Sequence, residues 1–200
     1  NPIGAFLEEA QGLLRVREPR RTPEEALAGE RRKVELAAEE CLKNGVTTFH
    51  DAGVSFRTID LYKKMAEEGK LGVRLYVMLS EGNRALAEKG AAYRMIGAAD
   101  NHLTVRAVKR LMDGALGSHG AWLLEPYADE PGQTGMNTEP IPALKEAAKL
   151  AIENGFQLNV HAIGDRANRE ALNVFEEAFK AHPDTKDLRW RIEHAQHLSA

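Results

Sequence analysis

The stretch LTVRAVKRLMDG, residues 103–114, reads as a β-strand that ends in a polar turn. Its β-branched and apolar residues favour a strand, and Asp113-Gly114 is a typical end for one. Four similar runs lie on either side of it, at residues 46–50, 73–79, 156–161 and 188–193. Helical segments separate most of the runs, so the order of elements predicts an α/β fold with a parallel sheet.

The helical segments are identified by the spacing of their apolar residues. The clearest start is Thr22, because Pro23 follows it and Glu25 stands at the third helical position, as in a capping box. The expected helices cover residues 5–14, 22–42, 56–68, 85–96, 141–153 and 167–180. Cys41 lies on the apolar stripe of the second helix, so we expect a buried structural thiol there.

The spacing of the strands favours a barrel over an open sheet. Strands that start at residues 46, 73, 104, 156 and 189 are separated by 27, 31, 52 and 33 residues. A (β/α)₈ barrel of about 250 residues uses about 31 residues per unit. The one long interval contains a Gly/Pro-rich insert, residues 114–140. A doubly wound sheet accepts the same order of elements, so periodicity alone leaves both architectures open.

Composition excludes several classes of protein. The 200 residues carry a net charge of −3 and no basic run, which argues against a nucleic-acid binder that works by bulk charge. Apolar stretches are too short for a membrane span. A single cysteine excludes an internal disulfide and a thiolate zinc site. The first residues contain no export signal, and they resemble the middle of a longer chain, so we expect a soluble, cytoplasmic protein.

The predicted strand ends carry most of the ionisable residues that point to chemistry. In parallel α/β folds the active site forms at the carboxyl ends of the strands. Here those ends bring His50-Asp51, Lys109 with Asp113, His161 with Asp165, and Glu193-His194. His161 and His194 end consecutive units, a spacing suited to sharing a metal ion. The alternative is that each imidazole binds a loop carbonyl.

Lys109 is unusual for its position inside a strand. Alternation places it with Val105 and Ala107 on a face that points into a barrel, while Arg106 and Arg110 point toward the helices and reach solvent with their tips. A buried lysine is costly unless it is paired or chemically altered. A neutral amine could add CO₂ and become a carbamate that bridges two metals. The alternative is an ion pair with Asp113 or Glu193.

Four motifs resemble one known family. VKRLMDGALGS at residues 108–118, NVHAIGDRAN at 159–168, RIEHAQ at 191–196 and GVTTFHDAG at 45–53 occur in the order typical of it. They are similar to motifs of the YtcJ-like branch of the amidohydrolase superfamily, also called amidohydrolase family 3. Members are metal-dependent hydrolases built on a TIM-like barrel, so the resemblance implies that the run containing His50 is the second barrel strand.

The resemblance also implies a ligand set. Lys109 falls at the fourth-strand position, where many members carry a carboxylated lysine that bridges two metals. His161 and His194 fall at the fifth- and sixth-strand ligand positions. The family's first-strand His-x-His and last-strand catalytic Asp have no counterpart here. We therefore expect residues 1–200 to be an internal part of one barrel domain, about strands 2 to 6, which is inactive alone. The implied cofactor is one or two divalent ions, zinc by preference.

Other residues are assigned supporting roles by the resemblance. Asp165 and Glu193 are expected to orient the two histidines, unless each is a loop cap or an ion pair. Further candidates to support the ligands or to contact the substrate are Asp113, His50 and Asp51. The insert is expected to cover the barrel mouth, with Trp122 and Tyr127 as substrate-pocket candidates that could equally pack against the rim. His119 stands where the family usually has Arg, which weakens any inherited anion-binding role.

The function implied is hydrolysis of a C–N bond, amide-like but not peptide, in a small-molecule substrate. Metal-activated water would attack the carbonyl carbon. The alternatives are a non-catalytic α/β domain with a binding or regulatory role, and a barrel phosphoesterase with a similar His cluster. We expect no nucleic-acid or membrane partner. Open sheet edges make a homo-oligomer conceivable.

Overall fold

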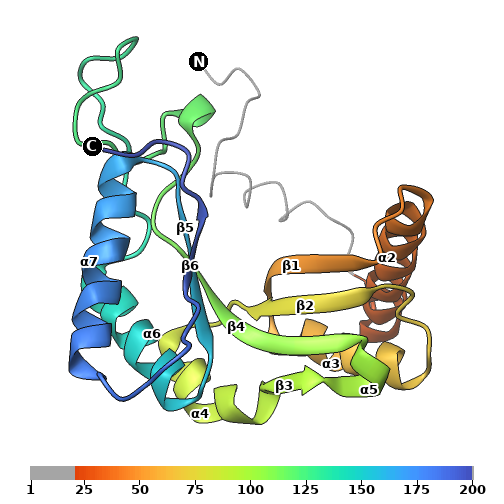
Figure 1. The fold of residues 1–200 in the computed structure, drawn as a ribbon. Helices are drawn as coiled ribbons and strands as arrows, with labels where there is room; N and C mark the ends of the chain where they lie inside the picture. The colour runs from red at the N-terminus through yellow and green to blue at the C-terminus, as the bar shows by residue number, and fades with distance from the viewer. Residues whose placement is uncertain (1–20, 200) are drawn as a thin grey trace.

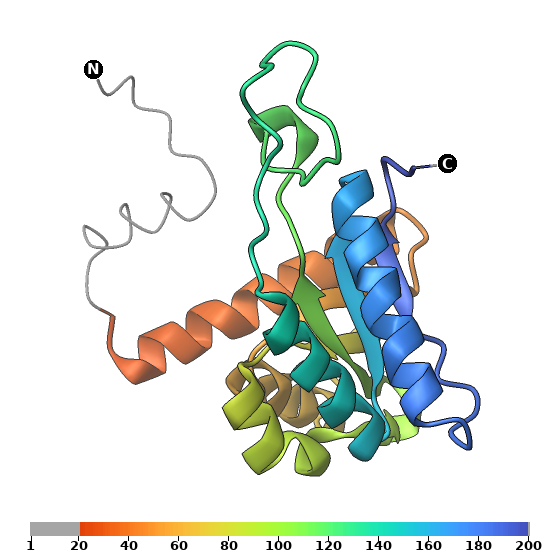
Figure 2. The same ribbon diagram turned by 90° about the vertical axis from the view of Figure 1, so that its left-hand side faces the viewer.

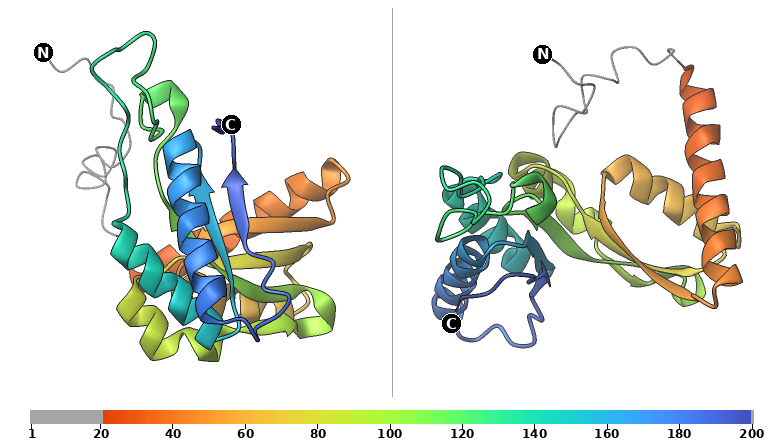
Figure 3. Two further views of the ribbon diagram at one scale, coloured as in Figure 1. Left: turned by 60° about the vertical axis from the view of Figure 1, so that its left-hand side comes forward. Right: turned by 90° about the horizontal axis from the view of Figure 1, so that it is seen from above.

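Five parallel strands, joined by helices, form a strongly twisted, curved sheet (Figure 1; the curvature is seen from above in Figure 3). The computed structural model describes residues 21–199. The strands are β1 (Thr48–Val54), β2 (Arg74–Leu79), β3 (Met95–Gly97), β4 (Leu103–Leu111), β5 (Gln157–Ala162) and β6 (Arg191–His194). The helices are α2 (Pro23–Lys43), α3 (Phe56–Glu67), α4 (Asn83–Tyr93), α5 (Ala98–Asn101), α6 (Ile141–Glu153) and α7 (Asp165–Ala181), with a 3₁₀ turn at Leu116–Ser118. The helix expected at residues 5–14 lies outside the described residues.

The order of the strands decides between the two architectures. The strand order is β1-β2-β4-β5-β6, and each of these strands is parallel to its neighbour. Each new parallel strand is therefore added on the same side of the preceding one. A doubly wound sheet reverses direction at a switch point, and no reversal occurs among the five parallel strands. The structure is therefore part of a TIM-like barrel. Figure 2 shows α4, α6 and α7 side by side along its outer face.

The hydrophobic core lies between the strands and the helices that follow them. Its largest side chains are almost entirely shielded from water, and each fully buried one contributes about 1.5–3 kcal/mol relative to an exposed position. From the strands come Val77, Leu79, Val105, Val108, Leu158 and Val160, and from the helices Ile59, Met65, Leu86, Leu144 and Phe175. This packing holds the sheet in place and leaves its other face to polar residues.

A β-bulge in β4 changes which residues share a face. Val77 pairs with Val105, but the next residue of β2 pairs with Ala107, so Arg106 is an extra residue in the strand. Val105 and Val108 both lie in the core, although strict alternation would separate them. The prediction that Val105 shares the face of Lys109 is therefore wrong. Arg110 does not reach solvent either, because its guanidinium is buried against Glu139.

Two further differences concern the ends of strands. β1 continues four residues beyond His50, so His50 and Asp51 lie in mid-strand and not at a carboxyl end. β3 and α5 replace the end of a predicted helix, and β3 pairs antiparallel with β4. Residues 97–101 contain four positive φ angles, which helical periodicity does not anticipate. Between residues 21 and 199, no helix combines the length and apolar character that crossing a membrane requires.

The capping box predicted at Thr22 is confirmed. Thr22 Oγ1 accepts a hydrogen bond from the Glu25 backbone, and Glu25 Oε2 accepts one from the Thr22 backbone at 2.8 Å. Cys41 is only half-buried, but it packs against the core as the apolar stripe predicts.

Thr22→Ala is expected to lower the free energy of unfolding by about 1 kcal/mol, since it removes one of the two reciprocal cap bonds. Urea-induced unfolding followed by circular dichroism measures the change. Thr22→Ser keeps the hydroxyl and serves as the control. An alanine variant as stable as the wild type would show that the cap contributes nothing.

Candidate metal centre

Three adjacent strands present their polar side chains to the concave face of the sheet. Lys109 pairs with Asn159, and Asn159 pairs with Arg191 on the next strand. Two residues further along, His161 pairs with Glu193. Because side chains of one strand alternate between faces, these residues all project from the same side. Asn159 and Arg191 were missed in the sequence, although the same alternation identifies them.

The two histidines predicted as ligands meet directly. The rings of His161 and His194 lie edge to face with centroids 4.6 Å apart. Alternation along β6 would point His194 away from the face that Glu193 occupies. Positive φ angles of 80° at His194 and 44° at Ala195 end the strand and turn the ring. The contact therefore depends on a backbone conformation that histidine adopts more readily than most residues.

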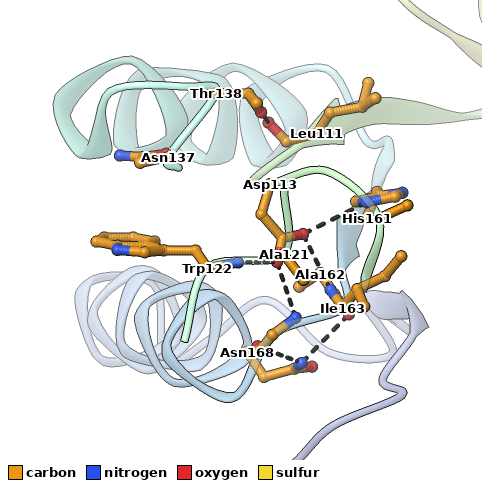
Figure 4. Close-up of polar contacts among 12 residues, drawn as sticks. Leu111, Asp113, Ala121, Trp122, Asn137, Thr138, His161, Ala162, Ile163 and Asn168 are labelled. Carbon is orange, nitrogen blue, oxygen red and sulfur yellow. Dashed lines mark hydrogen bonds and ion pairs between the residues drawn. The ribbon is translucent and has the colours of Figure 1, made fainter. Parts of the chain in front are cut away.

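His161 has a buried nitrogen without a hydrogen bond. Its Nε2 atom lies 3.4 Å from Oδ1 of Asp113, within ion-pair distance but without hydrogen-bond geometry. Figure 4 shows this contact beside the loop that follows β5. A buried imidazole nitrogen usually finds a partner, because leaving it unpaired costs about 1–3 kcal/mol. The unpaired atom is what a metal-ligating histidine presents before its ion is bound.

Lys109 is 5% exposed, and its one hydrogen bond among the described residues goes to the Arg110 carbonyl oxygen at 3.2 Å. Burial lowers the pKa of this amine from 10.5 to about 8, while the charge of Glu193 acts in the opposite direction. In residues 21–199 no carboxylate lies within ion-pair distance of it, so the expected alternative of an ion pair with Asp113 or Glu193 does not occur. The pKa of His194 is lowered by desolvation and then by the charges of His161 and Lys109.

We expect Lys109 to titrate near pH 8. Between about pH 8 and pH 10.5 the folded protein then binds fewer protons than the unfolded chain, so the destabilisation due to this buried charge is complete below pH 8 and fades as the pH rises from about 8 to 10.5. Nuclear magnetic resonance of the lysine side chains measures the midpoint, with Lys109→Met assigning the signal. A midpoint close to 10.5 would contradict the burial argument.

Asp113 connects the insert to the site. Its carboxylate is 1% exposed and accepts hydrogen bonds from three backbone N–H groups, of Trp122 at 2.9 Å, Ile163 at 3.0 Å and Gly164 at 2.8 Å. Figure 4 shows it between Trp122 of the insert and His161. A side chain at Gly164 would collide with the Trp122 backbone, so only glycine permits this close approach.

The expectation that Asp165 orients a ligating histidine is wrong. Its Oδ1 atom accepts from the backbone of Leu124 and of Arg166, so it anchors the insert to the start of α7. Asp113 occupies the place beside His161 instead. Glu193 lies 3.0 Å from Nη2 of Arg191, which is the ion-pair alternative, and its charge acts on both His194 and Lys109.

The two candidates on β1, His50 and Asp51, have different surroundings. His50 stacks on Tyr76 with ring centroids 4.6 Å apart and lies 3.5 Å from Nη1 of Arg191, so it joins the polar face some distance before the strand ends. Asp51 accepts a hydrogen bond of 2.6 Å from the hydroxyl of Tyr62 on α3. Asp51 therefore faces the helices, and its assignment to the site is a correction.

Two of the substrate-pocket candidates, Tyr127 and His119, bind groups within the insert, and the third, Trp122, contacts α7. Tyr127 is buried with Ala121 and donates its hydroxyl to the Ala121 carbonyl. His119 lies between the carboxylates of Asp129 and Glu130. The ring of Trp122 lies under the Arg166 guanidinium at 4.7 Å. Packing, the alternative for the two aromatic residues, accounts for these contacts. In Figure 1 the insert projects beyond the carboxyl ends of β4 and β5.

The donor set fits a divalent metal. No group of three His, Cys, Asp or Glu in residues 21–199 is arranged to hold an ion. Two imidazoles and one desolvated lysine converge instead. Imidazole nitrogen suits zinc and other first-row metals, and a carbamate on Lys109 would add an oxygen ligand. The unpaired Nε2 of His161 is the observation that favours a metal here.

Comparisons with known proteins agree with this reading. The profile of the family described as "Amidohydrolase family" matches residues 3–200. The chain is 30% identical over 216 residues to the protein LONG AFTER FAR-RED 3 of Arabidopsis thaliana, covering 99% of this chain and 35% of that protein. It is 29% identical over 205 residues to YtcJ of Bacillus subtilis (strain 168), which bears an amidohydrolase name, covering 98% and 36%.

Two solved structures share the fold. An uncharacterized metal-dependent hydrolase from Pyrococcus furiosus matches with a TM-score of 0.68 and 27% identity, over 85% of this chain and 34% of that one. Another from Pyrococcus horikoshii OT3 matches with a TM-score of 0.70 and 24% identity, over 92% and 39%. The chain spans about a third of the length of these relatives. The profile match, which covers nearly the whole chain, shows that it belongs to the amidohydrolase family.

Proposed function

We propose that the full-length protein is a metal-dependent hydrolase that cleaves an amide-like, non-peptide C–N bond in a small molecule. The observation that carries the proposal is the buried, unpaired Nε2 of His161, which lies against His194 and near the desolvated Lys109. His161, His194 and Lys109 would hold the ion, zinc by preference. When bound, such a metal supplies hydroxide at neutral pH and polarises a carbonyl group.

The residues of this chain have separate tasks in that proposal. Asp113 keeps the loop after β5 in place through its bonds to the backbone N–H groups of Ile163 and Gly164, and that loop directly follows the strand that carries His161. The lowered pKa of Lys109 leaves a fraction of its amine neutral near pH 8. That neutral amine can form an N–C bond to CO₂ and release a proton to water, which yields a carbamate anion able to bridge two ions.

Relatives support the proposal without establishing the reaction. The Pyrococcus furiosus protein is described as a metal-dependent hydrolase, and the family is that of amidohydrolases. This chain spans about a third of the relatives' length, so the proposed activity is that of the full-length protein.

The test uses the full-length protein purified without chelators. We expect at least one divalent ion per chain by elemental analysis, and hydrolysis of simple N-substituted amides that a chelator abolishes and added zinc restores. Phosphate esters serve as the comparison. A protein without bound metal and without hydrolysis would favour a binding or regulatory domain. Cleavage of phosphate esters alone would favour a phosphoesterase.

A further inference from the structure

A cavity of about 1000 Å³ opens beside Lys109, away from the aromatic residues of the insert. One wall is the loop at residues 80–83, which follows β2. The other is the segment at residues 136–140, by which the insert returns to α6 (Figure 2). Lys109 and Asp113 line the same cavity, so it is continuous with the candidate metal centre. Within the described residues, Trp122, Tyr127 and His119 do not line it.

Arg110 holds both walls of this cavity. Its guanidinium donates to the Glu81 carbonyl oxygen and to Oδ1 of Asn83, each at 2.6 Å. On the other side its Nε lies 3.3 Å from Oε1 of Glu139. The two side chains of this ion pair are 7% and 18% exposed. One buried cation therefore joins β4 to the loop after β2 and to the insert.

A second set of contacts fixes the returning segment against β4. The Thr138 hydroxyl donates to the Leu111 carbonyl oxygen at 2.8 Å, as drawn in Figure 4, and the Thr138 backbone donates to the Met112 carbonyl oxygen at 3.0 Å. The wall that carries Glu139 is thus built on the strand that carries Lys109. The cavity is a formed feature of the fold, since each of its walls is bonded to β4.

Apart from Lys109, which belongs to the candidate metal centre, the charged groups that line the cavity are engaged with protein partners. Arg110 faces Glu139, and the Asp113 carboxylate accepts three backbone N–H groups. Glu81 accepts the Phe56 backbone N–H at 2.9 Å. Burial raises the pKa of Glu139 and lowers the pKa of Arg110, so neither charge is well solvated. Once Lys109 is engaged at the metal centre, an ionic ligand group would therefore find no free counter-charge among these residues.

Two apolar side chains line the same cavity and remain partly open to solvent. Leu111 and Met136 are each 47% exposed, Leu111 at the end of β4 and Met136 on the returning segment. Pockets for small molecules commonly combine apolar surface with a few fixed polar groups. The combination here suits an uncharged group with an apolar part.

We propose that this cavity is the pocket for the substituent of the substrate, and that the Arg110–Glu139 pair makes it selective for uncharged substituents. The proposal rests on the proposed function, because the bond to be cleaved would lie at the candidate metal centre. It assigns specificity to loop 80–83, the segment 136–140 and Arg110, and not to the aromatic residues of the insert.

The first experiment compares three amides of one length whose substituents end in a methyl, a carboxylate or an ammonium group. For the full-length protein we expect kcat/KM to be at least ~100-fold higher for the methyl compound, since burying an unpaired charge costs several kcal/mol. Binding of the same compounds to the metal-free Lys109→Met variant, which lacks the free amine, is measured by calorimetry, and we expect the same order. Preference for either charged compound in both measurements would overturn the proposal.

The second experiment removes the counter-charge of Arg110. Glu139→Gln keeps the shape of the side chain and leaves the cation unneutralised, so we expect the preference to shift toward the carboxylate compound by at least ~10-fold. Glu130→Gln, on the exposed part of the insert, removes the same charge outside the cavity and serves as the matched control. Equal shifts in both variants, or none in Glu139→Gln, would show that the pair does not set specificity.

The third experiment fills the cavity and does not depend on the ion pair. A Cβ atom added at Gly82 would have no other atom within 4 Å, and Gly82 lines the cavity. Gly82→Phe is expected to weaken binding of the methyl compound at least ~10-fold while the metal content stays unchanged, and Gly132→Phe, equally unobstructed but on the insert, is the control. Unchanged binding in Gly82→Phe would place the substituent elsewhere.

Different results contradict the proposed reaction and the proposed pocket. If metal is bound but no amide is hydrolysed, the proposed reaction is wrong, whereas selective binding of the methyl compound that Gly82→Phe abolishes still supports the pocket. If amides are hydrolysed without preference among the three substituents, the reaction stands and the pocket proposal is wrong.

Discussion

Asp113→Ala lowers the free energy of unfolding of the full-length protein by at least about 3 kcal/mol, since it leaves three buried backbone N–H groups without an acceptor and each costs about 1–3 kcal/mol. The substitution leaves the backbone N–H groups of Trp122, Ile163 and Gly164 without an acceptor. Urea-induced unfolding followed by tryptophan fluorescence measures the change, and Trp122 lies at the broken contact.

Two variants separate this effect from a general loss of charge. Asp113→Asn keeps one oxygen acceptor and is expected to fall between the wild type and the alanine variant. Asp184→Ala removes an exposed aspartate and is expected to change stability by no more than about 0.5 kcal/mol. If the free energy of unfolding of Asp113→Ala lies within about 1 kcal/mol of the wild-type value, the insert is not anchored through this carboxylate.

Lys109→Ala reduces both the metal content and the hydrolytic activity of the full-length protein. Loss of a group that merely supports a metal ligand typically costs about 10–100-fold in affinity or activity, so loss of a ligand is expected to exceed roughly 100-fold. Elemental analysis of the purified variant and initial rates on the amide substrate measure the two effects. Both follow from the position of Lys109 beside His194 on the concave face.

Stability distinguishes a lost ligand from a damaged fold. In the metal-free protein, Lys109→Ala is expected to unfold no earlier than the wild type, because it removes a buried cation that has no ion-pair partner among the described residues. Lys149→Ala, an exposed lysine on α6, is the control and is expected to retain metal and activity. Unchanged metal content in Lys109→Ala would exclude this residue as a ligand.

Most of the element order could be predicted because each strand has a local signal. β2 and β4 are apolar runs that end at polar turns, and α2 begins at a complete capping box. β3 and α5 could not be predicted, since four positive φ angles in residues 97–101 interrupt what looks like one helix. The bulge at Arg106 was also hidden, because an extra residue in a strand leaves no mark in the sequence.

The candidate site could be predicted from the sequence only in part, because several of its contacts depend on how distant segments fold together. The meeting of His161 with His194 needed the turn of the backbone at His194, while the place of Asp113 beside His161 needed the fold of the insert. Asp165 follows β5 as closely as a ligand-orienting residue would, yet it anchors the insert. Sequence spacing places residues at the same rim but does not say which of them touch.

By itself, the sequence determined the alternation of strands and helices, the residues that end β4, β5 and β6, and the likeness to one family, since these depend on local pattern and motif. The tertiary structure alone decided the single winding of the sheet, the three hydrogen bonds that Asp113 accepts and the cavity between residues 80–83 and 136–140. These features depend on which distant segments come together, and that is set by packing between elements and not within them.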